Sequence, residues 1–377
     1  MNYNPSIASL DYKVKQIRGI DSIFYDYDVS TKQNFDNFNR TNQQFWRHYL
    51  MNKQSKNEVM VKKTVWRMLS DALLPYFEGG YLAIGGSTIN SFGTRNSDLD
   101  LCLAIRWGEN KIYDEDIALD ILTRAKNILL EEEFVANISL VPARVPIIKL
   151  YLKFPFNHLE VEMNCNCVAG IFNTHLLSYY GRLDERVPAM ASYLKDWAKK
   201  HEVINPKYGA LNSYTVMLMV IHFLQCAVDP PILPSLIDLF PNMFGGKGNV
   251  HDLEYDLQLN LPDIPKNERS LAELMYGFLN YYTQFDYEKA GISIREGRLF
   301  DRTRRPKKEE RFLFMLEEAY DGMTVPKNLI RHTKLQKIVK CFQEARDELL
   351  MNLVGDVIPA HLDIDDHEER EPFYRRN

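Results

Sequence analysis

The sequence predicts an α+β protein in which a small mixed β-sheet with helices is joined to a mainly helical region. Three observations carry this prediction. Strand and helix patterns alternate between Tyr81 and Cys165. After Asn173 apolar residues recur mostly at helical spacing. The segment Ala83–Ile105 places two aspartates in an apolar strand, directly after a glycine-rich turn.

Composition narrows the class of protein. The chain has 377 residues, of which 45% are hydrophobic, enough for two domains. Its formal net charge of −5 excludes a strongly basic nucleic-acid clamp. Five cysteines without a Cys-x-x-Cys pair and no apolar leader predict a reducing compartment, cytoplasmic or nuclear, and no apolar stretch has the length of a membrane span. A zinc site is the weaker alternative for a group of four residues, because their spacing fits zinc motifs poorly. These are His158, Cys165, Cys167 and His175.

The elements of the first half follow from periodicity. Residues 1–40 are polar and aromatic with weak periodicity, whereas 43–78 carry apolar residues at helical spacing. "YLAIGGS" and "DLDLCLAI" read as strands, and in the second of these Leu99, Leu101 and Leu103 share one face. Further patterns predict an amphipathic helix over 114–134 and strands within 136–153 and 158–165.

The second half reads as helices joined by loops. The helical patterns lie at 174–204, 208–228, 270–285 and 333–353. The segment 229–249 is rich in proline and glycine and is expected to be a loop. Its "GGKG" lacks the spacing of a Walker motif. The last residues are strongly charged.

The strand "DLDLCLAI" carries the chemistry. Alternation puts Asp98 and Asp100 on one strand face about 6–7 Å apart, where two carboxylates repel unless a cation lies between them. Hard oxygen ligands at this spacing suit Mg²⁺, or Mn²⁺. The preceding turn, Gly85-Gly86-Ser87, can bring backbone N–H groups close to a phosphate.

A third carboxylate is expected from "HLEVEMNC", where Glu160 and Glu162 share a strand face. Together these residues predict two-metal nucleotidyl or phosphoryl transfer. Taken singly, an Asp-x-Asp pair is often the polar face of an edge strand, and Gly-Gly is often a plain turn. Their joint occurrence with acids on a later strand favours catalysis.

These motifs resemble those of a known family. "GGSTINSFGTRNSDLDLCL" is similar to the signature of the DNA polymerase β-like nucleotidyltransferases, and most similar to the non-templated cytoplasmic poly(A) polymerases and terminal uridylyltransferases. "ARVPIIKLYL", "NCNCVAGIFNTHLL" and "FLNYYTQFDYE" extend the resemblance in order, from about residue 60 to 345. Within the family the sequence lies nearest the germline-type cytoplasmic poly(A) polymerases.

The resemblance implies a domain organisation. An N-terminal extension would cover residues 1–40, and the nucleotidyltransferase catalytic domain would cover 60–168. The helical central domain would combine 41–59 with 169–353, and a charged tail would follow at 354–377.

The resemblance also implies roles for single residues. Asp98, Asp100 and Glu162 match the three metal-binding acids, although the family has aspartate at the third position, and Glu160 is the weaker alternative. An asparagine common in the family is replaced by Cys167. The remaining matches would bind the nucleotide: Gly85, Gly86 and Ser87 at the phosphates, Asn173 and Thr174 near the ribose and base, Lys195, Lys199 and Ser213 at the triphosphate, and Tyr214 stacked on the base.

One loop bears on which nucleotide is used. Uridylyltransferases of the family carry an acid and an aromatic, followed by a histidine that helps to select uracil. Here Glu318 and Tyr320 take the first two places and Thr324 falls at the third. The resemblance therefore implies ATP as the substrate. A terminal uridylyltransferase and a weakly active scaffold, in which Glu162 slows turnover, remain the alternatives.

The substrate would be the 3′ end of an RNA. The sequence holds no RNA-recognition motif, and the basic run Arg302–Lys308, with Arg311, is either an RNA contact or a solubilising loop. Because intrinsic RNA affinity is expected to be weak, the resemblance implies a separate RNA-binding protein as partner.

Overall fold

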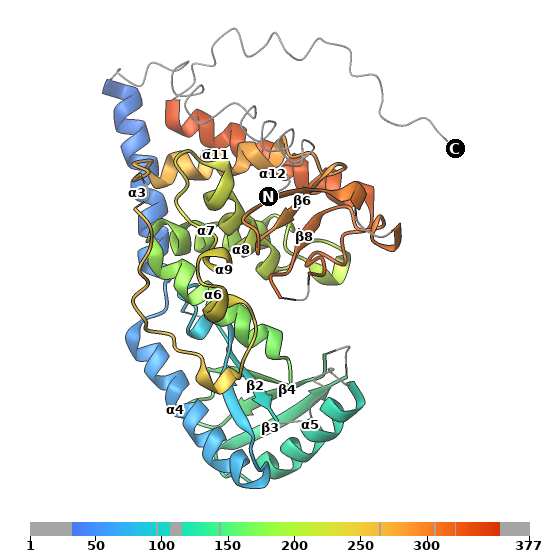
Figure 1. Ribbon diagram of the computed structural model, residues 1–377. Helices are drawn as coiled ribbons and strands as arrows, with labels where there is room; N and C mark the ends of the chain where they lie inside the picture. Colours follow the sequence, from blue (N-terminus) through green and yellow to red (C-terminus); the bar gives the residue numbers. More distant parts are fainter. Residues whose placement is uncertain are drawn as a thin grey trace.

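The chain folds into a sheet lobe, Lys56–Cys165, and a helical lobe, made of α3 (Lys32–Asn52) and the residues after Cys165 (Figure 1). The computed structural model describes residues 32–95, 97–105, 115–142, 145–263, 265–304, 307–320 and 322–354. Most of the predicted extension 1–40 and nearly all of the predicted tail 354–377 lie outside these residues.

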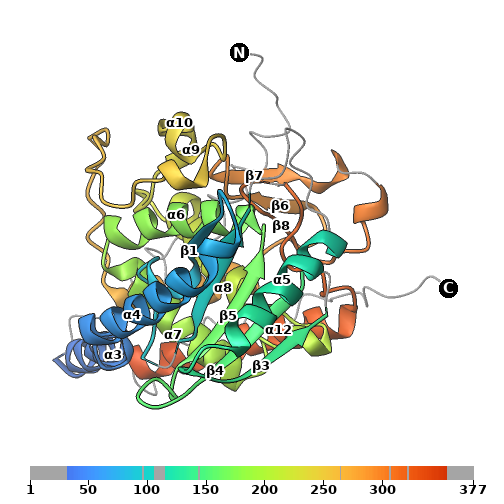
Figure 2. The same cartoon turned by 90° about the horizontal axis from the view of Figure 1, so that it is seen from below.

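The sheet lobe contains five strands in the order β1-β2-β5-β4-β3. β2 and β5 are parallel, and the other pairs are antiparallel. Helices α4 and α5 cover one face of this mixed sheet (Figure 2). The elements are α4 (Lys56–Leu73), β1 (Tyr81–Ile84), β2 (Leu99–Ala104), α5 (Glu115–Leu130), β3 (Val135–Val141), β4 (Ile147–Leu152) and β5 (Glu160–Cys165).

Alternation along β2 sorts its side chains between two environments. Leu99, Leu101 and Leu103 are each at most 1% exposed and belong to the core under α4 and α5, as the sequence predicts. Asp100 and Cys102 therefore face the other side of the sheet, toward the helical lobe. Burying the leucines fixes the register, because a slip of one residue would turn every leucine out of the core.

The helical lobe has a separate core built around α7, α8, α11 and α12. Two short helices, α9 and α10, lie in the segment that the sequence predicts as a loop. The helices are α3 (Lys32–Asn52), α6 (Val168–Leu183), α7 (Arg186–Lys200), α8 (Ser213–His222), α9 (Leu236–Leu239), α10 (Pro241–Phe244), α11 (Leu271–Thr283) and α12 (His332–Val354).

The structure adds two features to the sequence prediction. Residues 43–78, which the sequence predicts to be helical, belong to two helices, because Ser55 and Glu58 form a capping box that starts α4. The helical lobe also holds a three-stranded sheet that the sequence reading lacked. Its strands have only three or four residues each, too short for a clear alternation. They are β6 (Ala290–Ser293), β7 (Arg298–Asp301) and β8 (Met315–Glu317).

Within the described ranges, no helix combines the length and the apolar character that a membrane crossing needs.

Candidate active site

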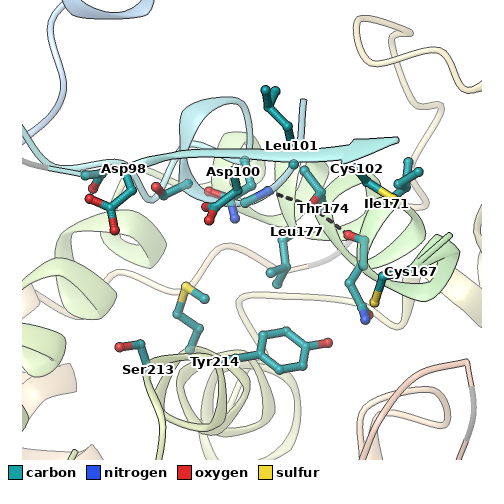
Figure 3. A pocket seen from close by; sticks show the side chains of 18 of the residues that line it. Asp98, Asp100, Leu101, Cys102, Cys167, Ile171, Thr174, Leu177, Ser213 and Tyr214 are labelled. Carbon is teal, nitrogen blue, oxygen red and sulfur yellow. Dashed lines mark hydrogen bonds between the residues drawn. The ribbon is translucent and has the colours of Figure 1, made fainter. Parts of the chain in front are cut away.

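A cavity of about 510 Å³ lies where the two lobes meet. The open face of the sheet and the turn after β1 form one wall, and α6, α7 and α8 form the others. Figure 3 shows Asp98 and Asp100 on one side, opposite Ser213 and Tyr214. Eleven of the predicted site residues line this cavity: Gly85, Gly86, Ser87, Asp98, Asp100, Asn173, Thr174, Lys195, Lys199, Ser213 and Tyr214.

The two aspartates carry unfavourable charge in the absence of a cation. Burial, the charge of Asp98 and the charge of Glu162 raise the pKa of Asp100 to about 6. Burial, followed by the charges of Glu160 and Glu162, also raises the pKa of Asp98. Hard carboxylate oxygens that repel one another on one face fit a divalent cation such as Mg²⁺.

The turn between β1 and β2 holds the backbone close to these carboxylates. Gly86 has φ +59°, and a Cβ at this position would lie 2.1 Å from Oδ2 of Asp100, so only glycine fits. The Gly85 N–H donates to the Asp100 carbonyl oxygen at 2.8 Å. The Gly86 N–H donates to Oγ1 of Thr174 at 2.9 Å, and that hydroxyl donates to the Gly170 carbonyl (Figure 3). Thr174, which is 4% exposed, therefore ties the turn to α6.

Glu162 is a neighbour of the pair but does not line the cavity. It lies opposite Asp100 in the parallel β2–β5 ladder and opposite Lys149 in the β5–β4 ladder. The ammonium group of Lys149 donates to its carboxylate. Across the described part of the chain, no three His, Cys, Asp or Glu side chains come together as a metal cage. The structure therefore brings Asp98 and Asp100 together and leaves Glu162 turned toward Lys149.

The opposite wall is positively charged. Lys195 and Lys199 lie one turn apart on α7 and both line the cavity. Burial and the neighbouring charge of Lys199 lower the pKa of Lys195. Ser213 is the first residue of α8, and the positive end of a helix dipole favours an anion. This wall suits a polyphosphate.

The predicted specificity loop lies behind Tyr214 and does not line the cavity. The Tyr214 hydroxyl donates to Glu318 at 3.5 Å, and the Tyr320 hydroxyl donates to the Phe172 carbonyl at 3.1 Å. Glu318 and Tyr320 thus contact residues of the cavity wall or their neighbours. Thr324 is 2% exposed, and its hydroxyl donates to the Phe314 carbonyl at 3.1 Å, so it is held within the hairpin of β8.

Asn164 and Lys62 are among the residues at the site that the sequence reading missed. Asn164 lines the cavity two residues after Glu162 on the same strand face, and the alternation of β5 could have revealed it. Its Oδ1 atom, like that of Asn173, is buried and accepts no hydrogen bond from the described residues, which suits a ligand group. Lys62 is buried and donates to the Asp98 carbonyl, and no sequence signal marked it.

Arg302, the first residue of the basic run, has a structural role. Arg302 donates to the carbonyl oxygens of Tyr287, Phe312 and Leu313, so its guanidinium group holds β7 against the chain before β8. Residues 305–306 of the run lie outside the described residues.

A mixed sheet that presents paired aspartates beside a glycine turn, faced by a helical lobe, has the architecture of a nucleotidyltransferase. Comparisons with known proteins agree. Residues 41–182 match the family model "Poly(A) RNA polymerase, mitochondrial-like, central palm domain", and residues 270–322 match "Cid1 family poly A polymerase".

Individual relatives give the same result. The chain is 37% identical over 260 residues to poly(A) RNA polymerase gld-2 of Caenorhabditis elegans, covering 67% of this chain and 23% of that protein. It is 32% identical over 316 residues to poly(A) RNA polymerase GLD2 of Rattus norvegicus, covering 80% and 63%. A solved GLD-2/RNP-8 complex contains a chain that aligns with TM-score 0.73 and 33% identity, over 84% of this chain and 98% of that one.

The chain therefore belongs to the Cid1-type poly(A) polymerase family of nucleotidyltransferases. The matched part spans less than two thirds of the full length of these two curated relatives.

Proposed function

We propose that this protein adds adenosines, without a template, to the 3′ end of RNA, using ATP and releasing pyrophosphate. The observation that carries the proposal is the cavity itself, which is large enough for a nucleotide and is lined by Asp98, Asp100, Lys195 and Lys199. Ser213 lies opposite the two aspartates (Figure 3). The family supports the choice of reaction, because its curated relatives are named poly(A) RNA polymerases.

Different residues of the cavity bind different parts of the nucleotide. Lys195, Lys199 and the start of α8 at Ser213 bind the triphosphate, and Tyr214 stacks on the base. The turn at Gly86 sets the backbone against the phosphates beside Asp100.

Asp98 and Asp100 would hold the divalent cation, Mg²⁺ or Mn²⁺. Such a cation would lower the pKa of the attacking hydroxyl and neutralise charge on the phosphates. The RNA 3′-oxygen forms a bond to the α-phosphorus of ATP, and the bond from that phosphorus to the pyrophosphate oxygen breaks. The protein's part is to hold the two reactants in line, which accounts for much of the rate gain in such transfers.

We propose ATP over UTP because Thr324 stands where the uridylyltransferases of the family have the histidine that helps to select uracil. The Thr324 side chain is held within the β8 hairpin. The charge of −5 offers little intrinsic RNA affinity, so we propose recruitment by an RNA-binding protein in the cytoplasm. The similar GLD-2 chain, solved with RNP-8, supports a protein partner.

An extension assay tests the proposal. The purified protein is incubated with an RNA oligonucleotide, Mg²⁺ and each of the four nucleoside triphosphates in turn, with and without co-purified RNA-binding proteins. Adenosine addition that outpaces the other three nucleotides supports the proposal. Faster uridine addition would make the protein a uridylyltransferase. No addition with any nucleotide would reject the proposal that the protein is an active nucleotidyltransferase.

The contact between Lys149 and Glu162 favours a second candidate, a weakly active scaffold that binds nucleotide and partner. Glu162 must leave Lys149 before it can join Asp98 and Asp100, and its side chain is one methylene longer than aspartate. Glu162→Asp distinguishes the two candidates. A large gain in the rate of adenosine addition supports the scaffold, whereas a loss indicates that glutamate works at this position.

A further inference from the structure

Lys62 on α4 is the one fully buried Lys, Arg, Asp or Glu of the described residues, with 2% of its surface exposed. Burying an ammonium group is costly unless charges and hydrogen bonds compensate. Lys63, the next residue of the same helix, is exposed as lysines usually are. The burial of Lys62 therefore calls for a local cause.

That cause lies at the start of β2. The Lys62 ammonium donates to Oε1 of Gln54 at 2.6 Å and to the Asp98 carbonyl at 3.3 Å. Both acceptors are neutral, so the compensating charge comes mainly from the carboxylates of Asp100 and Asp98. Burial lowers the pKa of Lys62, and these two carboxylates act in the opposite direction.

Gln54 extends the contact to the turn between β1 and β2 that contains Gly85, Gly86 and Ser87, called the phosphate turn below. Its side-chain amide donates to the Thr88 carbonyl at 3.2 Å, and its backbone N–H donates to the Gly93 carbonyl at 2.9 Å. The approach is close, because a Cβ on Gly93 would lie 2.9 Å from that amide nitrogen and 2.5 Å from the Ser87 carbonyl oxygen. Lys62 is thus bonded directly to the carboxylate strand and, through Gln54, to the turn.

Gln54 also lies where the chain passes between the lobes. Residues 53–55 join α3, which packs on α7, α11 and α12, to α4, which packs on β1 and α5. A shift of one lobe against the other would move Gln54, and with it the hydrogen bonds to Thr88 and Lys62.

We infer that Lys62 is a positioning residue of the nucleotidyl-transfer site, whose ammonium group fixes Asp98 and, through Gln54, the phosphate turn, and balances the charge of the paired carboxylates. The inference rests on the proposed function. The inference predicts a change in metal affinity opposite to the one expected of a lysine that only supports the fold. The Lys62 ammonium group and a divalent cation are attracted to the same carboxylates and repel each other. Removing the charge of Lys62 should tighten metal binding while slowing the reaction.

The experiment compares Lys62→Met with the matched control Lys63→Met, which removes an exposed charge from the same helix. Free Mn²⁺ is titrated by electron paramagnetic resonance without nucleotide, and steady-state tailing gives kcat and the KM values for ATP and RNA. Lys62→Met should bind Mn²⁺ about fivefold more tightly. Its kcat should fall about tenfold or more, with each KM changed less than about threefold. The control should match the wild type.

Weaker or unchanged Mn²⁺ binding by a folded Lys62→Met protein would overturn the inference, since a lysine that only supports the fold would loosen the site. If the methionine variant does not fold, Lys62→Gln makes the same comparison of charge. Gln54→Met keeps the charge of Lys62 but removes the hydrogen bonds that join Gln54 to both Lys62 and Thr88. It should lower kcat without the tighter Mn²⁺ binding expected of Lys62→Met, and an unchanged kcat would contradict the role of Gln54 as the link to the turn. The Mn²⁺ titration needs no catalysis, so absence of tailing by the wild type would reject the proposed function separately.

Discussion

Asp100→Asn should stabilise the metal-free protein while abolishing its activity. The Asp100 pKa is about 6 in the folded chain against an ordinary value of 3.8, a rise of about two units caused by burial and by the charges of Asp98 and Glu162. Each unit corresponds to about 1.4 kcal/mol, so the ionised carboxylate costs the folded state at most about 3 kcal/mol at pH 8. An amide of the same shape removes this cost.

The sign follows from the raised pKa. A carboxyl group that holds its proton more tightly in the folded state gives full stability below pH 3.8 and loses it as the pH rises through about 6. The entropy of unfolding for a chain of this length is about 0.8 kcal/mol/K, so 3 kcal/mol corresponds to about 4 °C. Asp100→Asn should therefore raise Tm by up to about 4 °C at pH 8 in EDTA, and by about half as much at pH 5.

Scanning calorimetry at both pH values, with EDTA and with Mg²⁺, checks this prediction. Mg²⁺ should raise the Tm of the wild type at pH 8, because the cation binds only the folded site, and should leave Asp100→Asn nearly unchanged. A variant less stable than the wild type in EDTA at pH 8, or a Tm difference independent of pH, would refute the argument that charge repulsion at the pair is relieved by a cation.

Three further predictions concern the walls of the cavity. Gly86→Ala should lower tailing by about 100-fold or more with an unchanged circular dichroism spectrum, because its Cβ collides with Asp100; a rate near that of the wild type would contradict the geometry of the turn. Thr174→Val removes the acceptor for the Gly86 N–H and should lower kcat/KM for ATP about tenfold, whereas an unchanged value would place the turn's support elsewhere. Lys195→Met should raise the KM for ATP about tenfold in steady-state tailing, and an unchanged KM would remove Lys195 from the triphosphate site.

Much of the sheet lobe follows from the sequence because its alternation is clear. Leu99, Leu101 and Leu103 are buried as predicted, which turns Asp100 toward the cavity. The break between α3 and α4 was also readable, since Ser55 and Glu58 have the spacing of a capping box. The helical period on both sides concealed it.

Other features depend on contacts between distant segments, which no local pattern reports. The pairing of Glu162 with Lys149 follows from the register of β5 against β4, which the sequence does not specify. The burial of Lys62 depends on acceptors supplied by Gln54 and by β2, whereas a lysine on an amphipathic helix is expected to face solvent.

The central claim is that the carboxylate pair in the interlobe cavity carries out nucleotidyl transfer. The most direct test is the rate of adenosine addition to an RNA 3′ end by the double variant Asp98→Ala/Asp100→Ala, measured beside the wild type at equal Mg²⁺. The account predicts a loss of about 1,000-fold or more in a protein that remains folded. A double variant that retains a rate within tenfold of the wild type would contradict it.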